Sequence, residues 1–210
     1  SAYQNLIQSY DGTTDAYTIN PDVVMTAEAD REATICRENR QVPQGAYSPL
    51  TNAYYVPAWN GPCSTIRVSS FTPTIETGYN TSNVGRAPNP VAHLGQPEAI
   101  DVSTGQTLWR LDREAPMYGM LTTGGGLLFA ADTHRRFYGI DQWTGEILWE
   151  TILNGVSDMA PISYAVDGRQ YVAVISPGGT NGSSGHMSQL GIPDQGNAGF
   201  TMFVFALPEQ

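Results

Sequence analysis

The sequence predicts an all-β fold of the β-propeller type, and two observations lead to this prediction. The segment EAIDVSTGQTLWRL returns 40 positions later as YGIDQWTGEILWET, so that Asp101, Thr104, Gly105 and Trp109 align with residues of the same type. A fixed period of this length in a strand-rich chain is typical of propeller blades. The composition agrees, because Gly (22) and Pro (14) are plentiful and only 14% of the 210 residues are charged, as expected for a loop-rich all-β protein.

Each copy of the repeat is expected to form a β-hairpin. Apolar residues alternate up to the Asp, and Asp-x-x-Thr-Gly is turn chemistry, because Asp accepts hydrogen bonds from its own turn and Gly supplies a positive φ. The Trp that follows each Gly by four positions lies on the next strand, where it is able to pack between adjacent blades. The repeat therefore predicts Trp109 and Trp149 buried between sheets, with Asp101 and Asp141 at exposed turns.

The rest of the chain is expected to alternate strands with long loops. Residues 1–30 are mostly polar and predict an irregular segment with one strand at 16–19. Residues 64–97 are rich in Thr, Ser, Asn, Gly and Pro, and predict a second long irregular segment of the kind that is usually functional or mobile. A turn is expected at 48–52, and the remaining strands are expected at 53–56, 127–131, 162–165, 170–175 and 200–206.

Charge and hydropathy exclude two classes of protein. The net charge of −10 argues against a nucleic-acid-binding protein, which needs basic residues to neutralise phosphates. No run approaches the roughly 20 apolar residues that span a bilayer. The chain starts without a signal peptide, as a mature secreted chain or an internal fragment would. His93, His134 and His186 lack metal-ligand spacing, so no histidine is assigned to catalysis or to a metal.

The chain contains two cysteines, Cys36 and Cys63, and they stand 27 residues apart. Neither belongs to a C-x-x-C pair of the kind that binds metals or performs redox chemistry. From the count alone, two buried free thiols and a disulfide remain equally open.

The repeat pattern A-x-D-x-x-T-G-x-x-x-W resembles the tryptophan-docking motif of the quinoprotein alcohol dehydrogenases, whose propellers bind pyrroloquinoline quinone (PQQ). The first copy matches at every fixed position, and the second has Gly139 in place of Ala. DGRQYVAVISPGG at 167–179 and FVFALP at 203–208 also resemble the carboxyl-terminal part of that family. The resemblance extends from about Ala33 onward. It implies that 1–210 is the carboxyl-terminal part of one propeller domain, with about three to four four-stranded blades of eight.

The resemblance also implies which residues contact the quinone. Gln41-Val42 stands where the family has an Asn-Trp pair, and Gln keeps the amide group on a longer arm. Met117 and Tyr118 align with a Trp-Gly-Gly turn that faces the quinone, although the Trp is absent. Thr180 lies in a Gly-rich loop that closes over the cofactor and often carries another Trp. Packing at a blade interface is an equally good explanation for Met117 and Tyr118.

The function that the resemblance implies is part of a PQQ- and calcium-dependent dehydrogenase that oxidises alcohols or aldehydes and passes electrons to an acceptor such as a cytochrome c. The family places the catalytic base and the calcium ligands in the amino-terminal part of the propeller, so no catalytic or metal-binding residue is assigned here. That part is expected from a preceding segment or a second polypeptide, and the chain alone is expected to be poorly soluble and inactive.

The resemblance further implies a Cys36–Cys63 disulfide and a periplasmic or secreted location, since disulfides persist in oxidising compartments. Two alternatives to the enzyme remain. The first is a non-catalytic propeller scaffold that shares these repeats and binds protein partners. The second, a WD-repeat protein, is weaker because the chain has no Trp-Asp dipeptide.

Overall fold

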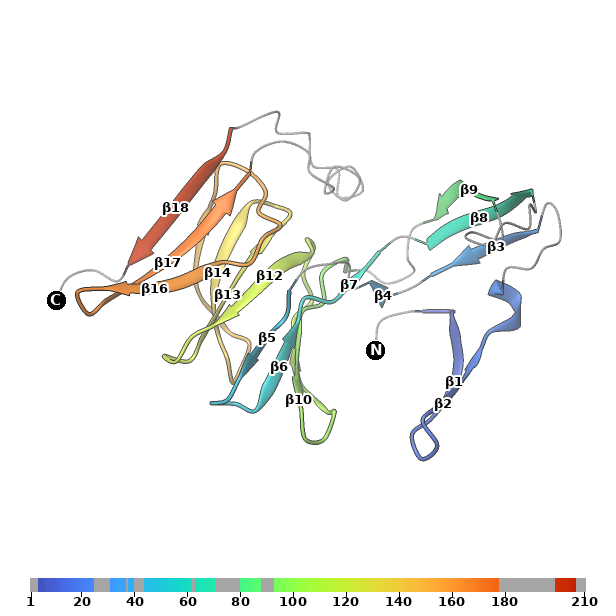
Figure 1. The fold of residues 1–210 in the computed structure, drawn as a ribbon, viewed down its shortest axis with the longest axis horizontal. Helices are drawn as coiled ribbons and strands as arrows, with labels where there is room; N and C mark the ends of the chain where they lie inside the picture. Colours follow the sequence, from blue (N-terminus) through green and yellow to red (C-terminus); the bar gives the residue numbers. More distant parts are fainter. Residues whose placement is uncertain are drawn as a thin grey trace. The chain divides into compact units, whose positions relative to one another are not determined.

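A computed structural model describes residues 4–24, 31–36, 38–39, 44–61, 63–70, 80–87, 93–177 and 199–206. The chain divides into two compact units, the first formed by residues 1–39 with 60–92 and the second by 40–59 with 93–210. Within the described residues no helix is long and apolar enough to cross a membrane. The elements, shown in Figure 1, are β1 (Ile7–Asp11), β2 (Ala16–Ile19), the 3-10 helix η1 (Pro21–Val23), β3 (Glu32–Ile35), β4 (Glu38–Asn39), β5 (Ala46–Ser48), β6 (Ala53–Val56), β7 (Trp59–Asn60), β8 (Cys63–Ser70), β9 (Asn80–Ala87), β10 (Glu98–Asp101), β11 (Thr107–Arg110), β12 (Met117–Thr122), β13 (Leu127–Asp132), β14 (Arg136–Asp141), β15 (Ile147–Ile152), β16 (Ile162–Val166), β17 (Arg169–Ser176) and β18 (Thr201–Ala206).

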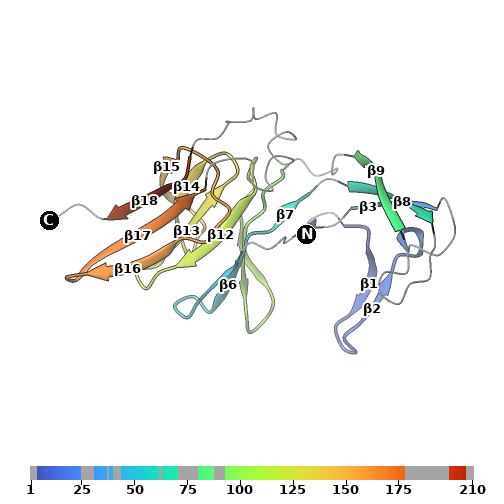
Figure 2. The ribbon, with the colours of Figure 1, turned by 45° about the horizontal axis from the view of Figure 1, so that its top comes forward.

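The second unit contains three successive antiparallel sheets, and this arrangement confirms the predicted partial propeller. Two of the sheets have four strands, in the orders β11-β10-β6-β5 and β12-β13-β14-β15. The third sheet has the order β16-β17-β18 among the described residues. Figure 2 shows the strands of the second and third sheets running beside one another. The predicted strand at 53–56 is β6, and each of the other strands predicted in this unit lies within one residue of β13, β16, β17 or β18 at both ends.

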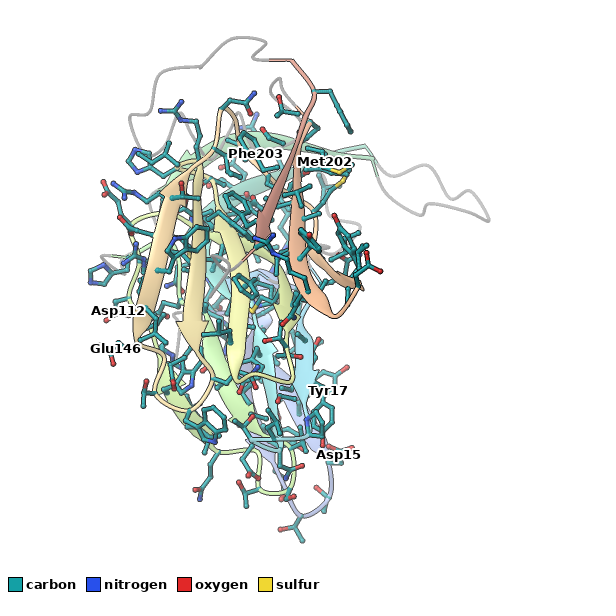
Figure 3. All side chains as sticks on the ribbon, turned by 90° about the vertical axis from the view of Figure 1, so that its left-hand side faces the viewer. Asp15, Tyr17, Asp112, Glu146, Met202 and Phe203 are labelled. Carbon is teal, nitrogen blue, oxygen red and sulfur yellow. A yellow bond between two sulfur atoms is a disulfide. The ribbon has the colours of Figure 1, made fainter. Side chains whose placement is uncertain are left out.

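The hydrophobic core of this unit lies between its sheets. One cluster joins the first sheet to the second and is formed by Ala53, Tyr55, Ala99, Trp109, Met117, Met120, Leu128, Ala130, Tyr138 and Ile140. A second cluster joins the second sheet to the third and is formed by Ala131, Phe137, Leu153, Val172 and Val174, with Phe203 and Phe205 packed against it. Side chains alternate on β18, because Phe203 packs against this cluster whereas its neighbour Met202 is 58% exposed (Figure 3). Burial between sheets, rather than inside one sheet, is the packing of propeller blades.

The two predicted hairpins form as the repeat indicates. The Asp101 Oδ1 atom accepts a hydrogen bond from the Ser103 amide at 2.9 Å, and Asp141 Oδ1 accepts one from the Trp143 amide at the same distance. Gly105 and Gly145 take φ values of 70° and 76°, which disfavour a side chain. Hydrogen bonds within each turn lower the pKa of the Asp101 and Asp141 carboxyl groups. The largest contributions come from Thr104 for Asp101 and from Thr144 for Asp141.

Trp109 is buried between the first two sheets, as predicted. Its side chain is 9% exposed, and its Nε1 atom donates a hydrogen bond to the carbonyl of Gln142 at 2.9 Å. The indole covers Gly145, where a Cβ atom would lie 2.9 Å from Trp109 Cδ2. Tyr55 donates its hydroxyl to the same Gln142 carbonyl at 2.9 Å. Trp109 therefore joins one sheet to the turn of the next.

The prediction that Trp149 is equally buried is wrong, because its side chain is 40% exposed. Its ring meets Phe205 edge-on, with centroids 5.2 Å apart, and Phe137 at 5.9 Å. The difference lies in the neighbouring sheet. Trp109 packs on the Thr-Gly turn of the next sheet, whereas among the described residues the third sheet has no such turn, and Trp149 meets Phe205 of β18 instead.

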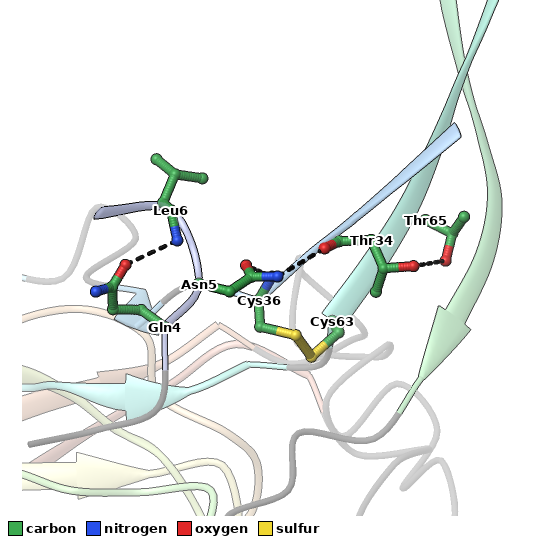
Figure 4. The surroundings of a disulfide bond; sticks show 7 residues. All are labelled: Gln4, Asn5, Leu6, Thr34, Cys36, Cys63 and Thr65. Carbon is green, nitrogen blue, oxygen red and sulfur yellow. Dashed lines mark hydrogen bonds between the residues drawn. A yellow bond between two sulfur atoms is a disulfide. The ribbon is translucent and has the colours of Figure 1, made fainter. Parts of the chain in front are cut away.

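The first unit contains more strands than the sequence predicts. Strands β3, β8 and β9 form one sheet and β1 pairs with β2 in another, so residues 1–30 and 64–97 are not uniformly irregular. The predicted strand at 16–19 is β2. The predicted Cys36–Cys63 disulfide is confirmed, and Figure 4 shows that Asn5 lies beside it. Asn5 Oδ1 accepts the Cys36 amide at 2.7 Å, which ties the start of β1 to the bridge.

Candidate functional site

Met117 and Tyr118 begin β12, which is an edge strand of the second sheet. β12 lies next to β5, an edge strand of the first sheet. The Met120 amide donates to the Gln44 carbonyl at 2.8 Å, and the Thr122 hydroxyl donates to the Tyr47 carbonyl at 2.9 Å. In a propeller the innermost strands of adjacent blades meet in this way around the central axis. The two candidate residues therefore start an inner strand.

Both side chains are buried at this point. Met117 is 1% exposed and belongs to the core cluster between the first two sheets, whereas Tyr118 is 9% exposed. Burial raises the pKa of Tyr118 to about 12, and the negative charge of Asp158 adds to the shift. The raised pKa makes loss of the phenol proton of Tyr118 harder, and a protonated phenol is able to donate a hydrogen bond.

The segment at 153–161 is held against β12 through Gly119. This glycine has a φ of +35°, and a Cβ atom on it would collide with the backbone of Met159 and Ala160. The approach of two backbones to this distance requires glycine. The same contact brings Asp158 close enough to Tyr118 for its charge to act on the phenol.

A buried network of three polar side chains supports the same end of the sheet. Asp132 lies opposite Met117 in the β12–β13 ladder and is 2% exposed. Tyr138 donates its hydroxyl to Asp132 Oδ2 at 2.6 Å, and Arg113 Nη2 donates to the Tyr138 hydroxyl at 2.8 Å. The Arg113 guanidinium also lies over the Tyr138 ring, 5.1 Å from its centroid. Burial raises the pKa of Asp132, against hydrogen bonds from Tyr138, Arg136 and His134 that lower it.

Several buried polar atoms around this end have no hydrogen-bond partner within the described residues. They include Thr133 Oγ1, Ser157 Oγ and Asp158 Oδ1. Thr133 is tied to the residue before Met117, because its amide donates to the Pro116 carbonyl at 3.0 Å. Buried polar groups are normally paired, so unpaired hydroxyls suit a ligand that presents oxygen acceptors. A quinone with carboxylate groups is such a ligand. The unpaired Oδ1 atom of Asp158, in contrast, is a hydrogen-bond acceptor, so it suits a hydrogen-bond donor on the ligand.

The structure does not test whether the four residues predicted to contact a cofactor share one site. Met117 and Tyr118 are neighbours on β12, whereas Gln41 and Thr180 lie outside the described residues. Asp158 and Arg113 give no signal in the sequence, because each lies in a segment without periodicity. Among the described residues, no group of three or more His, Cys, Asp or Glu side chains is placed to hold a metal ion.

Comparison with known proteins gives a family match over the two repeats. Residues 92–172 match the family model described as glucose/ethanol/alcohol dehydrogenase, beta-propeller domain. The chain is 31% identical over 139 residues to the quinohemoprotein alcohol dehydrogenase of Comamonas testosteroni. These residues make up 61% of this chain and 20% of that protein. It is 29% identical over 186 residues to the dehydrogenase subunit of the alcohol dehydrogenase (quinone) of Gluconacetobacter polyoxogenes. The alignment covers 82% of this chain and 25% of that subunit. The chain thus spans about a fifth to a quarter of the length of these relatives.

Solved structures agree in fold. A europium-containing methanol dehydrogenase superposes with a TM-score of 0.74 at 23% identity, over 98% of this chain and 40% of that chain. The Comamonas testosteroni quinohemoprotein alcohol dehydrogenase superposes with a TM-score of 0.68 at 22% identity, over 99% of this chain and 32% of that chain.

Proposed function

Because this chain is a member of the quinoprotein alcohol dehydrogenase family and carries part of its β-propeller over residues 92–172, we propose that it forms part of a PQQ- and calcium-dependent dehydrogenase that oxidises alcohols or aldehydes. The proposal depends most on one observation. That observation is the match of residues 92–172 to the dehydrogenase family model, since the packing of Trp109 on Gly145 supports the propeller but is also expected of a non-catalytic protein with the same repeats.

The cofactor would be held by Gln41, Met117, Tyr118 and Thr180. The quinone, when bound, supplies the two-electron acceptor that an alcohol oxidation requires. Met117 and Tyr118 offer it a polarisable and an aromatic neighbour. The hydroxyls of Thr133 and Ser157, which have no hydrogen-bond partner within the described residues, would be available as donors to its oxygen atoms. Gly119 fixes the backbone on which these groups are arranged.

Three further parts of the proposal concern the catalytic groups, the location and the domain. The catalytic base, the calcium ligands and the electron acceptor, such as a cytochrome c, belong to the remaining amino-terminal part of the propeller or to separate partners. We place the protein in the periplasm or outside the cell, which agrees with the Cys36–Cys63 disulfide. We also propose that both compact units belong to one propeller domain.

The experiment is a titration of the protein, expressed from its complete reading frame, with PQQ and calcium. We expect a bound quinone chromophore and dye reduction that depends on an alcohol or aldehyde. A Tyr118→Phe variant keeps the ring and should retain cofactor binding, whereas Tyr118→Ala removes the platform and should weaken it. The absence of a bound chromophore at saturating PQQ and calcium would refute the proposal that the protein is a PQQ-dependent enzyme.

A non-catalytic propeller scaffold is the second candidate, and one observation favours it. Met117 is 1% exposed within the core between two sheets, which is also the environment of a residue that only packs a blade interface. The same titration decides between the two, because a scaffold binds no quinone and yet keeps its propeller fold.

A further inference from the structure

Three hairpin turns of the first two sheets are joined at one end of the second unit. Figure 1 shows the turn between β5 and β6 and the turn after β10 at this end. The Val102 amide donates to the Asn52 carbonyl at 3.1 Å, and Asn52 Nδ2 donates to the Ser103 hydroxyl at 2.8 Å. The turn between β14 and β15 is joined to β6 by the Tyr55 hydroxyl, which donates to the Gln142 carbonyl at 2.9 Å. The three turns therefore form one connected end of the sheets.

Each of these turns exposes a large apolar side chain. Leu50, Val102 and Trp143 are 50%, 51% and 55% exposed. Ser103 holds the place of Trp143 in the preceding hairpin, so the chemistry of the turn does not require a Trp at this position. Single exposed apolar residues are common on proteins, whereas several on connected turns are typical of a protein interaction site.

Trp143 is held in place by the turn between β12 and β13. A Cβ atom on Gly126 would lie 2.4 Å from Trp143 Cζ3, so the indole lies directly on the backbone of Gly126. The Gln142 amide donates to the Gly126 carbonyl at 3.0 Å, which fixes the two turns against each other. The exposed part of the indole is therefore presented in a fixed orientation, and a partner that binds it loses little entropy in ordering it.

The same turns carry three carboxylates and no basic side chain. The Asp141 amide donates to the Glu146 carbonyl at 2.8 Å, and Asp101 holds the place of Asp141 in the preceding hairpin. Glu146 is exposed (Figure 3). Residues 46–55, 99–107, 121–128 and 139–147 contain no Arg, Lys or His. Six side chains form what we call the turn surface: Leu50, Asp101, Val102, Asp141, Trp143 and Glu146.

We propose that the turn surface binds a basic segment of a partner protein, and that an arginine of this partner stacks on Trp143. A guanidinium group can stack on an indole while it pairs with a carboxylate, and Trp143, Asp141 and Glu146 offer both groups within one turn. Trp and Arg are also the residues most enriched at the energetic centres of protein interfaces. A second copy of this chain, or an anionic lipid surface, would instead bring negative charge against the carboxylates.

The proposal is independent of the cofactor. Strand β12 runs from Met117, where the candidate site lies, to the turn at 123–126, so the site and the turn surface lie at opposite ends of this strand. A partner on the turn surface therefore leaves the candidate site accessible.

Isothermal titration calorimetry tests the proposal on the protein expressed from its complete reading frame, without cofactor, with a hexa-arginine peptide as the probe. We expect binding that weakens with added salt, and an affinity about two- to fivefold lower for Trp143→Ser. Leu148→Ser is the matched control, because Leu148 is also 55% exposed but lies on β15, outside the turns, and this variant should bind the peptide as the wild type does. The proposal is overturned if the wild type does not bind, or if Trp143→Ser binds as tightly as the wild type, which would mean that the peptide responds only to the net charge of −10.

A second pair of variants separates the turn surface from the overall charge. Glu146→Gln and Glu150→Gln each remove one negative charge from an exposed position of the same hairpin, and only Glu146 belongs to the turn surface. Glu146→Gln should lower the affinity for hexa-arginine by about two- to fivefold, and Glu150→Gln should leave it unchanged. An equal loss in both variants would contradict the proposal.

Sedimentation of the same protein tests the other two occupants. A dimer that Trp143→Ser dissociates would assign the turn surface to a second copy of the chain, and binding to phosphatidylglycerol vesicles that Trp143→Ser abolishes would assign it to a lipid surface. Either result would overturn the proposal. Because none of these measurements uses PQQ, failure of the proposed enzyme function and failure of this binding surface are distinguishable.

Discussion

The indole of Trp109 covers the backbone of Gly145, a residue of the next sheet, and leaves no room for a Cβ atom there. Gly105 occupies the same turn position in the preceding hairpin, and a Cβ atom on it would have no neighbour within 4 Å. The two glycines share a positive φ and differ in what lies over them. A comparison of the same substitution at the two glycines therefore separates the energy of the Trp109 contact from the strain of the turn.

Gly145→Ala should destabilise the protein more than Gly105→Ala. Both variants force a side chain into the left-handed region, which costs about 1–2 kcal/mol. Gly145→Ala adds the overlap with Trp109, for which overpacking costs about a further 1–3 kcal/mol. Chemical denaturation followed by tryptophan fluorescence measures the difference. Equal losses would show that the contact does not contribute to stability.

Trp109→Ala should cost about 3–5 kcal/mol of unfolding free energy, because it empties a buried site. Trp149→Ala should cost about 1–2 kcal/mol, since 40% of that side chain already faces water. The same denaturation experiment compares them. A Trp149→Ala variant as unstable as Trp109→Ala would mean that Trp149 is covered in solution by a part of the protein outside the described residues.

Asp132 should make the protein less stable as the pH rises from about 4. Its folded pKa is raised above the usual 3.8, so the folded state holds a proton that the unfolded state has released. Stability from this group is fully present below 3.8 and is lost as the pH rises through the folded pKa. The difference in unfolding free energy between wild type and Asp132→Asn, measured from about pH 3.5 to 7, should therefore fall with pH. A rising difference would contradict this sign.

Reduction of the Cys36–Cys63 bridge should loosen the first unit alone. A closed loop of this length is worth about 3 kcal/mol in the chain-entropy description. All four Trp residues belong to the second unit, so tryptophan fluorescence should keep its unfolding transition while exchange at β8 accelerates. A Cys36→Ser/Cys63→Ser variant without reductant is the control. Unchanged exchange at β8 in both samples would show that the bridge is not needed for the sheet.

Turn chemistry explains how much of the fold can be predicted. The Asp and Thr contacts and the positive φ of Gly145 are local, so the repeat sequence is enough to predict both hairpins and the burial of Trp109. The turn of the β1–β2 hairpin uses the same contacts, from Thr13 and Thr14 to Asp11, but Asp15 replaces the Gly and no Trp follows, so the sequence pattern does not identify it. Strands β8 and β9 escape prediction because Ser, Thr and Asn mask their alternation.

The candidate site is harder to predict, because its supporting residues are joined by packing and not by sequence spacing. Asp132 and Arg113 meet only through Tyr138, and Asp158 reaches Tyr118 only because Gly119 admits the backbone of a distant segment. Gln41 and Thr180 lie outside the described residues, so their part in the site remains a prediction. The exposure of Trp149 depends on the neighbouring sheet, which no local pattern describes.

The acceptor for both Trp109 and Tyr55 is the main-chain carbonyl of Gln142, and every amino acid has that group. Replacement of the Gln142 side chain therefore leaves the acceptor in place. The aligned residue of the preceding hairpin is Val102, which differs from Gln142 in both polarity and shape. The Gln142 side chain is constrained for a different reason, because it is 0% exposed and its Nε2 atom donates to the carbonyls of Thr123 at 3.0 Å and Leu127 at 2.8 Å, whereas Val102 is 51% exposed. A substitution at 142 therefore threatens the turn that carries the acceptor and not the acceptor group itself.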